Sequence, residues 1–243
     1  MPQGRVLLGE HGMGSEFQKI WKIYKKFIIG DIRPIKRILQ GDNIMKLDLR
    51  DIPYLCGLLT PIIAYALIFM AISITREFSW YHNALSDLGG PLGIRYGANV
   101  VFNSGLIIAG ILLLIFAIQV LTDFQYLVRK IGAFILLLSA ISLTLIGVFP
   151  ETAGKIHYYV SVAFFITFPL GMLIISTVDI IKREDLVLGI YGVIVFILCA
   201  VIWSLPWGIF GVTGVAIPEF LSSLTGSIWI VLFAIKKLLE KRH

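Results

Sequence analysis

The sequence predicts an all-α, polytopic integral membrane protein in which six transmembrane helices form a bundle. Of its 243 residues, 58% are hydrophobic and 15% are charged, whereas about a quarter of the residues of a soluble domain are charged. The apolar residues stand in runs of about 20, the length that a helix needs to cross a hydrocarbon core of about 30 Å. These runs lack the two-residue alternation of barrel strands, so helices are the remaining way to satisfy the backbone in lipid.

The breaks between the apolar runs carry turn or charge chemistry. Examples are Gly89-Gly90-Pro91, Asp123 and Lys182-Arg183-Glu184-Asp185, which are residue types that interrupt a transmembrane helix. An even number of spans places both termini on the same side of the membrane. We predict spans over residues 52–74, 98–121, 131–149, 156–178, 186–207 and 215–235, within a transmembrane domain of residues 51–238.

Lysine and arginine are distributed unevenly about these spans. Of the 21 such residues, Arg76, Arg95 and Lys155 fall in alternate loops, and the other 18 flank the spans on the opposite side, which includes a basic tail at residues 239–243. Because cytoplasmic flanks retain positive residues, we expect the N and C termini to be cytoplasmic. This topology and contact with anionic lipid explain the net charge of +6, so nothing here predicts nucleic-acid binding.

Residues 1–50 form a basic cytoplasmic segment before the first span. Apolar residues recur at helical spacing between Phe17 and Ile28, with lysines between them, as in a helix that lies on an anionic membrane surface. A second interpretation stays open, because Met13 begins a sequence typical of a cloning junction and Met45 is a candidate alternative start. We see no removable signal peptide, so we expect the first span to target the chain to the membrane.

Polar residues gather in the three loops that this topology places outside. A carboxylate at membrane depth is costly without a partner or a watery cavity. We therefore expect these residues to share an outward-facing polar cup that binds a small polar ligand, a cation or a lipid headgroup at the outer leaflet. A polar residue of the second span reaches toward the same place. The ligand-binding candidates are His82, Ser86, Asp87, Asn103, Glu151, His157 and Glu219.

An enzymatic alternative uses the same residues. His82 or His157 could serve as the base of an intramembrane metal-dependent hydrolase or transferase acting on a lipid or lipid-linked substrate. The spacing from His157 to Ser161 places an imidazole and a hydroxyl on one helical face, although such spacing is common by chance. Zinc accepts such nitrogen and oxygen ligands, but no HExxH-like spacing occurs, so a divalent metal cofactor has weak support. Its candidate ligands are His82, Asp87, Glu151, His157 and Glu219.

A structural alternative assigns the acidic residues to helix capping. Pro150-Glu151 and Pro218-Glu219 each suit a helix start, where a proline loses no hydrogen bond and a carboxylate faces the positive end of the dipole. Ser86-Asp87 is also typical of a capped turn. In that case the chain is a structural or assembly protein whose outer polar residues hold the helices together.

Several motifs carry a resemblance to a known family. They are Asn83-Ala84-Leu85-Ser86-Asp87-Leu88-Gly89, Phe102-Asn103-Ser104-Gly105, Gly147-Val148-Phe149-Pro150-Glu151 followed by His157, and Ile217-Pro218-Glu219. Over about residues 50 to 238 the chain resembles the membrane family called domain of unknown function 998, which is distantly similar to the Frag1/DRAM/Sfk1 group of six-span proteins. The resemblance implies a prokaryotic plasma-membrane protein, and it matches Asp87, Glu151, His157 and Glu219 to the polar motifs of the family. It implies no reaction and no cofactor.

Overall fold

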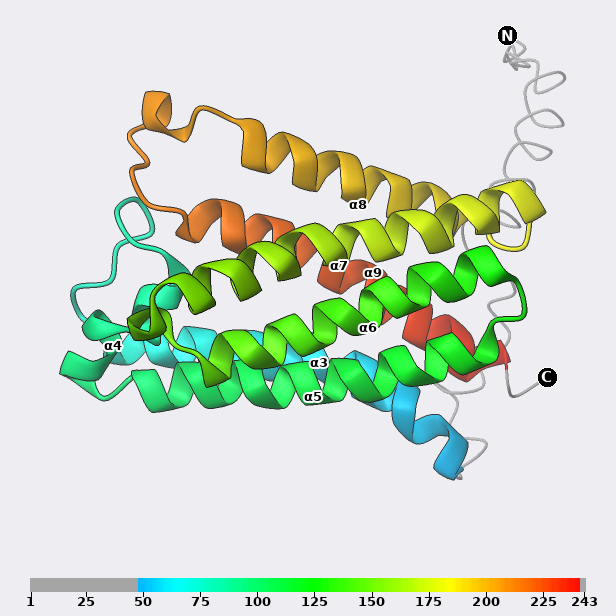
Figure 1. The fold of residues 1–243 in the computed structure, drawn as a ribbon, viewed down its shortest axis with the longest axis horizontal. Coiled ribbons are helices and arrows are strands. Elements are labelled where there is room, and N and C mark those ends of the chain that lie inside the picture. The colour runs from blue at the N-terminus through cyan, green and yellow to red at the C-terminus, as the bar shows by residue number, and fades with distance from the viewer. Residues whose placement is uncertain (1–47, 241–243) are drawn as a thin grey trace, which may run out of the picture. The chain divides into compact units, whose positions relative to one another are not determined.

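Six long helices run side by side in the computed structural model, which describes residues 48–240 (Figure 1). In that part of the chain all six are long and apolar enough to cross a membrane. The predicted all-α fold with six spans is therefore confirmed, whereas the N-terminal amphipathic helix lies outside the described residues. The helices are α3 (Ile52–Ile74), α5 (Asn99–Asp123), α6 (Leu127–Val148), α7 (Lys155–Lys182), α8 (Leu186–Ser204) and α9 (Ala216–Glu240).

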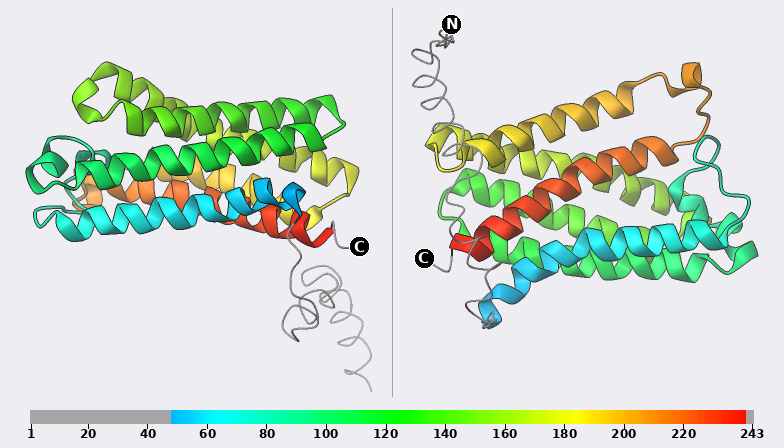
Figure 2. Two further views of the ribbon diagram at one scale, coloured as in Figure 1. Left: turned by 90° about the horizontal axis from the view of Figure 1, so that it is seen from below. Right: turned by 180° about the vertical axis from the view of Figure 1, so that it is seen from behind.

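The six helices form a closed ring in the order of the chain. Each packs against the next, and α9 returns to pack against α3 (Figure 2). The helix α8 packs mainly against α7 and α9, and its apolar stretch is the least buried of the six. One side of α8 is therefore left facing the surrounding lipid.

The short elements lie at one end of the bundle, which we call the loop end (Figure 1). Four backbone hydrogen bonds join the first and last of its loops; among them, the Tyr81 carbonyl accepts from the Thr213 amide at 2.7 Å, and the Asn83 carbonyl accepts from the Ala216 amide at 2.9 Å. The loop between α3 and α5 is thereby fixed beside the start of α9. These short elements are η3 (Leu85–Leu88), α4 (Pro91–Tyr96), η4 (Glu151–Ala153) and η5 (Trp207–Phe210), and a turn η2 (Leu49–Asp51) precedes α3.

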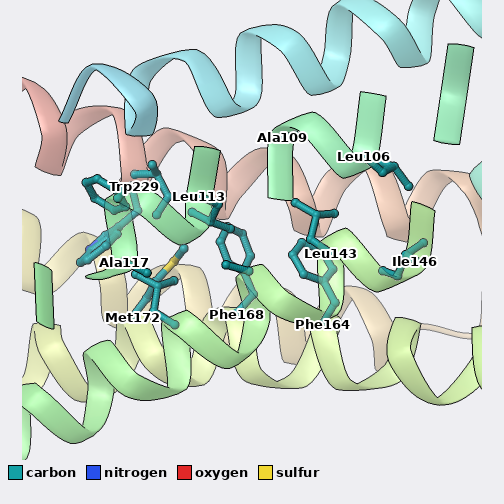
Figure 3. Packing of buried hydrophobic residues seen from close by; sticks show 14 of the residues in the cluster. Leu106, Ala109, Leu113, Ala117, Leu143, Ile146, Phe164, Phe168, Met172 and Trp229 are labelled. Atoms are coloured by element: carbon teal, nitrogen blue, oxygen red, sulfur yellow. The ribbon is translucent and has the colours of Figure 1, made fainter. Parts of the chain in front are cut away.

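Large apolar side chains and close helix contacts fill the middle of the bundle. Phe168 and Met172 of α7 and Trp229 of α9 lie among the buried residues drawn in Figure 3. Because lipid tails are as apolar as these side chains, helices in a membrane gain from close approach at small residues. A Cβ on Gly132 would lie 3.0 Å from the Gly171 carbonyl oxygen, so glycine is what lets α6 and α7 touch there.

Several helices begin or end at residues other than the ends of the predicted spans. The helix α6 begins at Leu127, four residues before the predicted span, because a helix can continue past the hydrocarbon into the headgroup region. The helix α8 ends at Ser204 and not at residue 207, since Pro206 restricts the residue before it. Leu205 accordingly has extended dihedrals, with φ −66° and ψ 139°.

A buried ion network ties the helices together at the opposite end. Arg129 of α6 is 5% exposed and donates to Asp179 of α7 and to Glu184, with its guanidinium 5.3 Å from the centre of the Phe124 ring. The sequence analysis used Arg129 only as a sign of topology. It also joins two neighbouring helices and the turn that follows α7.

Candidate functional site

A cavity of about 900 Å³ lies between α7, α8 and α9 and reaches the loop end. Four elements supply its polar lining. Ser86 comes from η3, Glu151 from η4, His157 and Ser161 from the first turns of α7, and Glu219 from the first turn of α9. All of these side chains belong to the loop end of the bundle.

The rest of the cavity wall is apolar and lies deeper in the bundle. On α7 the lining continues through Phe165 to Leu170, and α8 adds Phe196 and Trp203. Because α7 runs away from the loop end, the 14 residues from His157 to Leu170 correspond to about 20 Å along its axis. Ile166 is 58% exposed and Trp203 is 41% exposed although both line the cavity. The cavity therefore opens sideways, toward the lipid around the bundle.

Glu219 joins η3 to α9 beside this cavity. Its side chain is buried, and its Oε2 accepts a hydrogen bond of 2.7 Å from the Leu85 amide. The sequence analysis offered Glu219 as a cap of its own helix, but its carboxylate instead receives the amide of a residue 134 positions away. This contact holds η3 in place, so that Ser86 forms part of the cavity wall.

Asp87 and Glu151 form an acidic pair, of which Glu151 lines the polar end of the cavity. Asp87 caps η3, because its Oδ2 accepts from the Asn83 amide group at 2.6 Å and from the Ala84 backbone amide at 3.1 Å. Burial raises the pKa of Glu151 above its ordinary value, and the charge of Asp87 and a hydrogen bond with it raise this pKa further. A Cβ at Gly90 would meet the Glu151 side chain, so glycine leaves the room for the pair.

His157 is held between a backbone carbonyl and a hydroxyl. Its Nδ1 lies 2.8 Å from the Phe149 carbonyl oxygen, and its Nε2 lies 3.4 Å from the Ser161 Oγ. The ring is 8% exposed. Gly154 makes this placement feasible, since its φ of 63° and ψ of −119° turn the chain from η4 into α7 in a conformation that suits glycine.

Besides Asp87, two candidate residues lie away from the cavity wall. The exposed His82 places its Nδ1 3.0 Å from the Thr213 hydroxyl, and Asn103 donates to the Gly89 carbonyl at 3.1 Å. Both contacts fasten the loop between α3 and α5. Among residues 48–240 no three His, Cys, Asp or Glu side chains are arranged to hold a metal ion, so the geometry adds no support to the metal alternative.

A second cavity, of about 90 Å³, adjoins the first. The two share lining from Ser86, Ser161 and Glu219, and the smaller one extends to Tyr65, whose hydroxyl donates to the Ser223 Oγ at 3.1 Å. The polar end of the large cavity thus continues inward as a narrow branch whose lining is mostly apolar, with a few hydroxyls such as those of Tyr65 and Ser223.

Sequence analysis did not find the apolar wall of the large cavity. Phe165 and Trp203 are large apolar residues in transmembrane spans, where such residues face lipid, core or ligand alike. In the sequence, Pro169 and Pro206 come closest to indicating where this wall lies. A proline inside a helix removes one hydrogen bond, and a proline after a helix ends it, but neither residue type identifies a cavity.

Known proteins were compared with the chain in three ways. Neither the curated proteins nor the solved structures contain a match. A family model described as Protein of unknown function (DUF998) matches residues 58–236. That range begins within α3, ends within α9 and includes every polar residue of the cavity wall. Because the match covers most of the chain, the protein belongs to the DUF998 family of proteins of unknown function.

Proposed function

We propose that this membrane protein binds an amphiphile, a molecule with a polar head and an apolar chain, in the large cavity between α7, α8 and α9. The observation that carries the proposal is the division of one cavity into a polar end and an apolar wall. Its volume of about 900 Å³ lies within the range of small-molecule sites. The length of its wall on α7 is close to one leaflet of a bilayer whose core is about 30 Å thick.

The sideways opening supports entry from the membrane. Ile166 and Trp203 are exposed at the cavity wall, so an apolar chain can enter between α7 and α8 without crossing water. The polar head then comes to lie at the loop end, where Glu219 and His157 offer hydrogen-bonding groups. A small polar solute would leave most of the apolar wall unused, so an amphiphile accounts for more of the cavity.

The charge of the wall favours one kind of head. The lining contains Glu151 and Glu219 and no lysine or arginine. An anionic phosphate would find no compensating cation there, whereas an ammonium or hydroxyl-bearing head would meet acceptors. We therefore propose a cationic or hydroxyl-bearing amphiphile.

We place the loop end outside a plasma membrane, with both chain termini in the cytoplasm. The support is the distribution of charge: Arg129, Lys130 and Lys182 lie at the opposite end, and among the few cations at the loop end, Arg95 is paired with Glu77. Since basic residues are retained in the cytoplasm, the amphiphile would come from the outer leaflet.

The test uses the full chain purified in detergent and two matched tryptophan variants. Ala200 lines the cavity and Ala66 is an exposed residue of α3 outside it. A photoreactive alkyl amine should crosslink to α7 or α8 in the wild type and in Ala66→Trp. In Ala200→Trp the indole fills the cavity, so crosslinking should fall about tenfold or more, the equivalent of about 1.4 kcal/mol of binding.

The alkyl chain is then supplied with different heads. An alkyl alcohol should compete with the amine, and an alkyl phosphate of equal chain length should compete poorly. Equal crosslinking in Ala66→Trp and Ala200→Trp would contradict the cavity as the binding site. Equal competition by the phosphate would contradict the proposed head.

A further inference from the structure

The contact between Ser161 and His157 differs from that of other helical hydroxyls in this chain. Thr144, Thr167 and Ser204 donate to the backbone carbonyl four residues earlier, at 3.0, 2.6 and 2.7 Å. Such bonds are the usual local use of a hydroxyl inside a helix. The Ser161 hydroxyl instead lies 3.4 Å from the imidazole of the residue four positions earlier.

The partner of the other ring nitrogen determines the tautomer of His157. The Phe149 carbonyl oxygen is only an acceptor, so Nδ1 at 2.8 Å from it carries the proton. In the neutral ring Nε2 is then unprotonated and is the acceptor facing Ser161. A hydroxyl, an imidazole with its free nitrogen toward that hydroxyl, and a third group that orients the imidazole are the three parts of an activated serine. Here the Phe149 backbone carbonyl is the group that orients the imidazole.

We infer that Ser161 and His157 act as nucleophile and general base in an acyl transfer from an ester-bearing amphiphile, an inference that rests on the proposed binding function. Both residues line the large cavity. An acyl chain that lies along Phe165 and Leu170 would bring its carbonyl to the level of Ser161, because these residues follow Ser161 on the same helix. The distance of 3.4 Å is loose for a catalytic hydrogen bond, as is common before a substrate is bound.

The reaction balances with water as the second reactant. The Ser161 Oγ attacks the carbonyl carbon while its proton passes to His157 Nε2. The bond from that carbon to the alcohol oxygen breaks, and the alcohol leaves with the proton from His157. Water then attacks the acyl-serine, gives one proton to His157 and releases a carboxylic acid. The proton returns to Ser161, so the pair ends as it began.

Ser86 is the group best placed to stabilise the carbonyl oxygen. It lines the large and the small cavity together with Ser161, and its hydroxyl is a donor. A donor at the oxygen that gains charge contributes about 100-fold to 1000-fold in rate. Glu219 fixes the backbone of Leu85 next to it, so the position of Ser86 depends on the same glutamate that lines the cavity.

The test is labelling by a biotinylated alkyl fluorophosphonate, an apolar chain that carries a serine-reactive phosphorus. Full-length protein in detergent should be labelled at Ser161, as located by mass spectrometry. Ser161→Ala should lose the label, and Ser204→Ala, which changes another helical serine at the loop end, should keep it. His157→Gln should slow labelling about 100-fold or more, the lower range for a general base. Ser161→Cys should regain reactivity, toward N-ethylmaleimide.

Two controls separate this inference from the binding function. Ser161→Ala must keep the thermal unfolding midpoint of the wild type in detergent, which shows that the fold persists. A wild type that crosslinks the amine but is not labelled at Ser161 would overturn the acyl transfer and leave the binding function standing. Labelling of His157→Gln at the wild-type rate would also overturn it. Absence of both crosslinking and labelling in the wild type would contradict both proposals.

Discussion

At the residue scale, two glutamates at the loop end make different contacts although their sequence contexts are similar. Glu151 and Glu219 both follow a proline at the start of a helical turn, yet Glu219 receives the amide of Leu85 and Glu151 faces Asp87. The difference comes from the neighbouring group that another element places beside each glutamate. For Glu219 this is a backbone donor, whereas for Glu151 it is a second acid, which favours a shared proton.

This pair predicts how stability depends on pH. The folded chain holds a proton on Glu151 more tightly than the unfolded chain does, because its pKa is raised above 4.5. The stability that this proton contributes is present below the pKa of Glu151 in the unfolded chain. It is lost as the pH rises through the pKa of Glu151 in the folded chain. In Glu151→Gln the amide donates to Asp87 at every pH. The thermal midpoint of Glu151→Gln relative to the wild type should therefore increase as the pH rises above about 4.5.

The matched control is Glu77→Gln, which changes an exposed carboxylate paired with Arg95. It should show no such gain in relative midpoint as the pH rises. The measurement is thermal unfolding in detergent at a series of pH values. If the difference in thermal midpoint between Glu151→Gln and the wild type does not change with pH, Asp87 and Glu151 do not share a proton.

At the element scale, the sequence predicts the number and nature of the helices, but not what lies between them. Long apolar runs must be helical in lipid, and this requirement is local, so all six spans are found. The ends differ because helices such as α6 and α7 continue past the hydrocarbon. Of the candidate residues, Ser86, Glu151, His157 and Glu219 share the cavity wall. The apolar wall depends on how α8 packs, which no single run of sequence encodes.

The ion network of Arg129 gives a second prediction, on how α6 is tied to α7. In Arg129→Met the buried Asp179 loses its main partner, and breaking a buried pair in this way costs about 3 kcal/mol or more. The exposed pair of Arg95 and Glu77, with side chains 65% and 55% exposed, is the control. Arg95→Met should cost less than about 1 kcal/mol. Chemical unfolding of the purified variants would measure both losses, and equal losses would show that burial of the pair has little effect.

At the scale of the whole bundle, the two ends differ in charge. The loop end carries the cavity with Glu151 and Glu219, and it has few cations. The opposite end carries the buried Arg129 network with its acidic partners and most of the basic residues, among them Lys130, Lys182 and Lys237. A bilayer with an anionic cytoplasmic surface favours one orientation of such a bundle. The same orientation places the cavity in the outer leaflet, so the topology and the proposed function depend on each other.

The last prediction tests that orientation with single cysteines. The native Cys56 and Cys199 are both buried, so replacing them with alanine provides a background for labelling. Thr152 at the loop end and Gln125 at the opposite end are both exposed loop residues. On intact cells an impermeant thiol reagent should label Thr152→Cys, because the proposed topology keeps the basic end in the cytoplasm. Gln125→Cys should react only after the membrane is permeabilised. The reverse pattern would place the cavity in the inner leaflet and would require the amphiphile to come from the cytoplasmic side.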